Sequence, residues 1–203
     1  IAKRAKNRGK FFEQQVAKII LDTFKNSGIK EFADLERKNV RRRFVTESHE
    51  DERGDIRIYN HKYLKRCFPF CVECKDVASL PTLEKLLVKR TKIWQDCWEQ
   101  CVDQAELMGL IPLFVWKRGK DDRDILCAVH GVPWMPHVQT KIRQEILEGE
   151  VLVFEFKTFL QVCVEQSKDF VNLKGGYKKA SSPSRSHYRQ VFLRQSHLIL
   201  KEL

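Results

Sequence analysis

The sequence predicts an α/β fold in which a small mixed β-sheet is covered by helices. Three observations support this prediction: an early segment with apolar residues at helical spacing, several short apolar segments typical of strands, and a long amphipathic segment between two of those strands. The chain has 203 residues, of which 42% are hydrophobic and 32% charged, so it is large enough for one globular domain with a core.

The first expected element is a helix over residues 9–28. Its apolar residues recur at helical spacing and form one stripe: Phe12, Val16, Ile19, Ile20 and Phe24. Gly28 ends the segment, as glycine often does after a helix, and Glu13 lies at the edge of the apolar stripe.

Two strands are expected next, with charged segments around them. Residues 37–54 are densely charged and predict a weak strand followed by a loop. Alternating isoleucines predict a strand over 55–60. Residues 61–67 predict a turn, and the aromatic, valine and cysteine residues that follow predict a strand over 68–75.

A long helix is expected over 82–109, directly after Pro81, because one of its faces is apolar throughout. It leads into a strand over 110–117, and after a charged turn another strand is expected over 125–129. The order of helix, strands, long helix and strands is typical of a mixed sheet flanked by helices.

Extra elements are expected after this core. Residues 138–148 predict a helix, 151–156 a strand and 157–166 a short helix. From about residue 172 the chain is rich in Gly, Ser, Pro and basic residues, which is typical of a flexible segment.

We therefore expect a folded domain over residues 1–165 and a basic, partly flexible extension over 166–203. Residues 1–10 hold five basic and no acidic residues, and residues 167–203 hold eight basic and two acidic residues. The whole chain has a formal net charge of +11, which favours a polyanionic partner, either nucleic acid or an anionic membrane surface. No apolar run approaches the roughly 20 residues that a membrane-spanning helix needs.

The number and spacing of the cysteines indicate whether the protein works in a reducing or an oxidising compartment. All seven are scattered, and the first ten residues have no apolar core of a signal peptide, so reduced thiols and a cytoplasmic location are expected. A zinc site is the alternative, because Cys67, Cys71 and Cys74 are close in sequence. A strand over 68–75 would point Cys71 and Cys74 to opposite faces, which argues against that site.

Three charged residues carry the candidate chemistry. In the strand over 68–75, Glu73 and Lys75 share one face, opposite the face of Phe70 and Val72 that we expect in the core. Asp55 opens the neighbouring strand, so it can converge with Glu73 if the two strands pair. The alternative is an exposed Glu73–Lys75 pair on an edge strand, which would contribute only a few tenths of a kcal/mol.

A divalent cation is expected where these residues meet. Two carboxylates at about 3–4 Å repel each other unless a cation lies between them. Oxygen ligands without histidine or thiolate favour a hard ion, Mg²⁺ with Mn²⁺ as a substitute. A lysine beside such an ion can hold an attacking water and balance charge on phosphorus, so the set fits phosphodiester hydrolysis.

Asp55, followed by Glu73-Cys74-Lys75, resembles the core motif of the PD-(D/E)XK nuclease superfamily. Further features are similar to its archaeal and phage Holliday-junction resolvase branch: NRGKFFE (7–13) with Glu13, Gly54-Asp55-Ile56 at a strand start, and the Trp- and Gln-bearing helix that leads into a strand, WEQCVDQAELMGLIPLFVWK (98–117). The resemblance covers roughly residues 8–130 and implies a restriction-endonuclease-like core. Two departures are the absence of a proline before Asp55 and the high charge of residues 41–53.

The resemblance also implies roles for individual residues. Asp55 and Glu73 would coordinate Mg²⁺ together with the Cys74 carbonyl, and Lys75 would orient or activate the water. Glu13 would hold a metal-bound water or a second ion.

The long helix is expected to contribute a glutamine. Gln100 or Gln104, one turn apart, would face the site and help to position the scissile strand. Trp94 and Trp98 on the same helix fit either a dimer interface or the core.

The resulting hypothesis is a Mg²⁺-dependent DNA endonuclease that resolves Holliday junctions or other branched DNA in recombination, replication or repair. Such an enzyme cuts two strands symmetrically, so a homodimer is expected. If phage-encoded, it would act in the host-cell cytoplasm. The alternatives are another PD-(D/E)XK endonuclease of the nicking, restriction or repair type that acts on duplex DNA, and a catalytically silent DNA-binding protein.

Overall fold

The computed structural model describes residues 2–43, 54–88, 91–118, 124–130 and 151–172. Their strands form one mixed sheet in the order β1-β2-β3-β4-β5-β6. The strands are β1 (Val40–Arg42), β2 (Ile56–Ile58), β3 (Phe70–Asp76), β4 (Ile111–Lys117), β5 (Leu126–His130) and β6 (Val151–Glu155). This mixed sheet flanked by helices confirms the predicted fold class, including its restriction-endonuclease-like arrangement.

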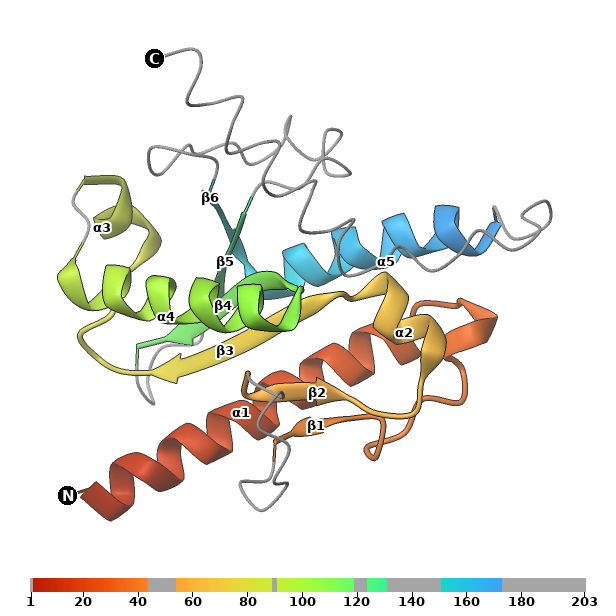
Figure 1. The fold of residues 1–203 in the computed structure, drawn as a ribbon, viewed down its shortest axis with the longest axis horizontal. Helices are drawn as coiled ribbons and strands as arrows, with labels where there is room; N and C mark the ends of the chain where they lie inside the picture. Colours follow the sequence, from red (N-terminus) through yellow and green to blue (C-terminus); the bar gives the residue numbers. More distant parts are fainter. Residues whose placement is uncertain (1, 44–53, 89–90, 119–123, 131–150, 173–203) are drawn as a thin grey trace, which may run out of the picture.

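Helices cover both faces of the sheet (Figure 1). The chain connects β3 to the parallel strand β4 through α3 (Leu83–Val88) and α4 (Lys92–Met108), because parallel neighbours need a long crossover. The helices α1 (Ala2–Lys25) and α5 (Phe156–Asn172) pack against the opposite face. All other neighbouring strands pair in antiparallel fashion.

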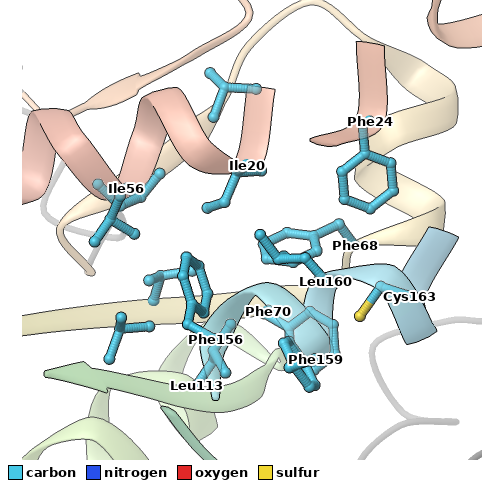
Figure 2. Packing of buried hydrophobic residues seen from close by; sticks show 14 of the residues in the cluster. Ile20, Phe24, Ile56, Phe68, Phe70, Leu113, Phe156, Phe159, Leu160 and Cys163 are labelled. Atoms are coloured by element: carbon cyan, nitrogen blue, oxygen red, sulfur yellow. The ribbon is translucent and has the colours of Figure 1, made fainter. Parts of the chain in front are cut away.

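The larger core lies between the sheet and helices α1 and α5. Figure 2 shows Phe24 of α1 above Phe68 and Phe159 of α5 beside Phe70, with ring centroids 5.7 Å and 5.4 Å apart. Val72 and Cys74 belong to the same core cluster, so the expected inward face of the strand over 68–75 is confirmed.

The second core lies between the sheet and α4. Trp94 is fully buried and Trp98 is 8% exposed, and the Trp94 ring packs against Phe114 and Trp116 of β4. These tryptophans are core residues, which leaves little of either side chain for an interface with a second subunit.

Several elements differ from the sequence-based expectation. The helix α1 starts at Ala2 rather than near residue 9, because the basic stretch before Gly9 consists largely of Ala, Lys and Arg, which favour helix without any apolar period. The turn expected over 61–67 is the short helix α2 (Lys62–Cys67), whose first turn is capped by the His61 ring accepting a hydrogen bond from the Leu64 N–H.

The long helix expected over 82–109 is two helices. Thr91, the residue directly before α4, has extended backbone angles, so the helix does not continue through this position. The short helix expected over 157–166 is the longer helix α5, which runs to Asn172. The helix expected over 138–148 and the segment after residue 172 lie outside the described residues.

No helix in the described part of the chain combines the length and apolar character needed to span a bilayer.

A buried carboxylate connects α1 to the ends of β3 and β4. The Asp76 side chain is 2% exposed, with Arg8 Nε 3.7 Å and Lys117 Nζ 3.9 Å from its Oδ2. Arg8 also donates to the Asp76 carbonyl at 3.0 Å, and Lys117 donates to Gln15 of α1 at 3.2 Å. Asp76 thereby fixes α1, which carries Glu13, relative to the strand that carries Glu73 and Lys75.

We expect Asp76→Ala to lower the free energy of unfolding by about 3 kcal/mol, because the substitution leaves the buried Lys117 ammonium without a carboxylate. Urea unfolding followed by circular dichroism measures the change. The control is Glu165→Gln, which removes the exposed ion pair with Lys168 and should leave the midpoint unchanged. Equal midpoints for Asp76→Ala and the unmodified protein would show that the cluster does not hold α1 in place.

Candidate active site

The backbone at Gly54 brings Asp55 onto strand β3. Gly54 has φ +82°, and a Cβ there would lie 3.0 Å from Cys71 Sγ and 3.2 Å from the Val72 carbonyl oxygen, so the position requires glycine. The Asp55 N–H donates to the Val72 carbonyl at 2.7 Å. The Asp55 carboxylate then reaches along β3, where its Oδ2 accepts the Cys74 N–H at 2.8 Å.

Glu73 lies in the centre of the sheet, under α4. Its side chain is 4% exposed, and β3 is flanked by β2 and β4 on its two sides. Glu73 Oε1 accepts hydrogen bonds from Lys75 Nζ at 2.5 Å and from Gln100 Nε2 at 3.1 Å. The alternative of an exposed ion pair on an edge strand is therefore wrong.

Asp55 binds the backbone of Val72 and of Cys74, the residues on either side of Glu73, so Asp55 and Glu73 lie close together. Burial and the negative charge of Glu73 raise the pKa of Asp55 to about 7, with a smaller contribution from Glu13. The Cys74 N–H and the Lys75 ammonium oppose this rise only in part. Without a cation, the site therefore retains a proton on Asp55 at a pH where an ordinary aspartic acid has lost it.

Lys75 is held in its charged form. Burial acts to lower the pKa of Lys75, but the hydrogen bond and attraction from Glu73, with the charge of Asp55, outweigh it and raise the pKa. At neutral pH the residue is an ammonium that can donate hydrogen bonds and offset negative charge.

Glu13 approaches from α1 but is engaged elsewhere. Its Oε2 accepts a hydrogen bond from Arg42 Nε of β1 at 2.9 Å. Across the described residues, no three His, Cys, Asp or Glu side chains are grouped closely enough to hold a metal ion. The structure thus brings Asp55 and Glu73 together, and Glu13 acts on Asp55 through its charge without joining them in a three-residue ligand set.

The Asp55–Glu73 pair fits a divalent cation. Each carboxylate has one oxygen engaged by protein donors, and no described residue donates a hydrogen bond to Asp55 Oδ1 or Glu73 Oε2. A cation would remove the repulsion that raises the pKa of Asp55. The Cys74 side chain lies in the core on the α1 side of the sheet. Only the main-chain carbonyl of Cys74 could therefore bind such an ion.

The predicted opposite orientation of Cys71 and Cys74 is confirmed. Cys71 Sγ lies 3.9 Å from Met108 Sδ of α4, whereas Cys74 packs in the core on the α1 side. All seven cysteines are free thiols.

Two contacts of the site were not expected from the sequence. Gln104 Oε1 accepts the Gly54 N–H at 2.9 Å, so Gln104 binds the protein backbone directly before Asp55. Arg42 pairs with Glu13, and the signal for this pair was the alternation in β1, which places Arg42 on the same face as the buried Val40.

A family model described as "Phage putative PDDEXK endonuclease" matches residues 4–169. No curated protein and no solved structure matches the chain. The matched range includes all of the site residues described above and extends into α5, well beyond the region 8–130 that carries the resemblance in sequence.

Proposed function

The chain belongs to this family of phage PD-(D/E)XK endonucleases, and from that membership we propose that it hydrolyses phosphodiester bonds in DNA with the help of Mg²⁺. One observation carries the proposal: the partly buried carboxylate of Asp55, directly before β2, and the buried carboxylate of Glu73 in β3 repel each other beside a charged lysine. Mn²⁺, which also favours oxygen ligands, is the expected substitute.

Asp55 and Glu73 would hold the cation through the carboxylate oxygens that accept no hydrogen bond from a described residue, together with the Cys74 carbonyl. When bound, the cation supplies Lewis-acid polarisation of a phosphate oxygen and acidifies its bound water. Gln100 fixes the Glu73 carboxylate in its rotamer, because it donates to the same oxygen as Lys75. Glu13 would bind a water of the cation from the α1 side.

Lys75 acts as a donor in this proposal. Its raised pKa keeps the ammonium charged at neutral pH, so it can orient the attacking water by a hydrogen bond and stabilise negative charge on the phosphate. A charged ammonium cannot accept the proton of that water, so the role of Lys75 is orientation and charge balance.

Branched DNA is the proposed substrate class. The resemblance to the Holliday-junction resolvase branch supports it, and the basic character of residues 1–10 and 167–203 favours contacts with phosphates rather than with bases. Symmetric cutting of a junction requires two active sites, so the acting form would be a two-fold homodimer.

The test uses a labelled four-way junction, a linear duplex of the same sequence and a single strand, each with Mg²⁺ or with EDTA. Paired, symmetric nicks in the junction alone are the expected result. Metal-dependent cutting of the linear duplex as well would favour a nicking, restriction-type or repair nuclease. DNA binding without any metal-dependent cutting would contradict the endonuclease proposal and leave a DNA-binding protein.

A further inference from the structure

Strand β2, which begins directly after Asp55, has only a short ladder with β3. It has three residues, and its ladder with β3 contains the single pair Ile56 and Val72. Residues 44–53, directly before Gly54, lie outside the described residues. The position of Asp55 therefore depends on few contacts besides the ladder.

Helix α4 supplies one of those contacts. Gln104 Oε1 accepts the Gly54 N–H at 2.9 Å, directly before Asp55, in the left-handed backbone turn that only glycine can make there. One helical turn earlier, Gln100 Nε2 donates to Glu73 at 3.1 Å. Residues four apart share one face of a helix, so a single rigid element contacts the surroundings of both carboxylates.

The contact of Gln104 is with the backbone, in contrast to that of Gln100. The remaining hydrogen bonds of Asp55 come from strands: its N–H donates to Val72, its carbonyl accepts from the Arg43 N–H at 2.9 Å, and its carboxylate accepts from Cys74. Without the Gln104 acceptor, these contacts alone would hold the backbone at Gly54 and Asp55 in place.

We propose that Gln104 is a positioning residue, which sets the distance between Asp55 and Glu73 by anchoring Gly54 to α4. This inference rests on the proposed function, because it concerns the pair of carboxylates assigned to the cation. When two ligands are already held at a fixed separation, binding a divalent ion loses less conformational entropy, and the affinity is higher. Residues that orient metal ligands typically change metal affinity by about 10- to 100-fold when substituted.

The test compares Gln104→Met, which keeps the length of the side chain and removes the acceptor, with Gln104→Glu, which keeps an acceptor oxygen. We expect Gln104→Met to weaken Mn²⁺ binding by about 10- to 100-fold in calorimetry and to increase amide hydrogen exchange at Gly54. In cleavage assays the metal concentration for half-maximal activity should rise by the same factor, with kcat at saturating metal changed far less. Gln104→Glu should restore the Gly54 protection and most of the metal affinity.

The control is Gln95→Met on the same helix, whose side chain makes no hydrogen bond to any described residue. It should match the unmodified protein in all three measurements. Unchanged Mn²⁺ affinity in Gln104→Met, together with increased exchange at Gly54, would overturn the positioning role. If the unmodified protein binds Mn²⁺ but cuts no DNA, the proposed function is contradicted. The role of Gln104 is still tested in that case, because calorimetry measures the Mn²⁺ affinity of the variants without any cleavage.

Discussion

Asp55→Asn is expected to abolish metal-dependent cleavage and at the same time to stabilise the metal-free protein at pH 8. Cleavage should fall by about a thousandfold or more, because Lewis-acid stabilisation contributes several kcal/mol and each 1.36 kcal/mol is tenfold in rate. Stability should rise because the neutral amide removes the buried charge that Glu73 repels. The amide oxygen can still accept the Cys74 N–H, so the fold of the site is retained.

The matched variant is Lys75→Met, which should lose cleavage to a similar degree but be less stable than the unmodified protein. This substitution leaves the buried Glu73 carboxylate with Gln100 as its only described donor. Single-turnover cleavage and thermal unfolding, both at pH 8, measure the two effects. DNA binding in EDTA should be preserved in Asp55→Asn. If Asp55→Asn cuts DNA at an undiminished rate, the assignment of the site is wrong.

The second large effect is a pH-dependent stabilisation by metal. The pKa of Asp55 is about 7 in the folded, metal-free protein, above the ordinary value of 3.8. The folded state therefore holds a proton that the unfolded chain has already lost, and metal-free stability falls as pH rises from about 4 to 7, by at most about 1.36 kcal/mol per unit. Above pH 7 this contribution is constant.

A cation competes with that proton for Asp55. Below pH 7 metal affinity should therefore decrease by up to about tenfold for each unit of pH, and above pH 7 it should level off. We expect saturating Mg²⁺ or Mn²⁺ to raise the unfolding temperature clearly at pH 8 and much less at pH 5.5. Differential scanning calorimetry with metal or EDTA measures this, and Asp55→Asn should remove most of the pH dependence. An equal metal effect at both pH values would show that Asp55 does not bind the ion.

The sequence was sufficient to predict the sheet and the approach of Asp55 to Glu73, for definite reasons. The strand over 68–75 has two faces of different character, and only the face with Phe70 and Val72 can enter an apolar core, so Glu73 and Lys75 had to share the other. Gly54 directly before Asp55 indicated a sharp backbone turn into the next strand.

Other features had no local signal in the sequence. From the sequence we expected Glu73 and Lys75 on one face of their strand, but not that α4 would bury Glu73. That burial depends on a helix that is distant from Glu73 in sequence and packs over it only in the fold. The break before α4 left the apolar periodicity of residues 82–109 intact, so periodicity predicted one helix. For Arg42, alternation in β1 indicated the inward face, but it did not identify Glu13 as the partner, because that contact depends on the position of α1 across β1.

The packing of α1 against α5 has a consequence during protein synthesis. Helix α1 buries its apolar stripe against residues of the last described helix, 156–172, and against strands that lie between the two helices in sequence. A nascent chain that has not yet emerged beyond these residues lacks one side of its main core. The core that supports the strand carrying Glu73 is therefore complete only after residues 156–172 have been synthesised.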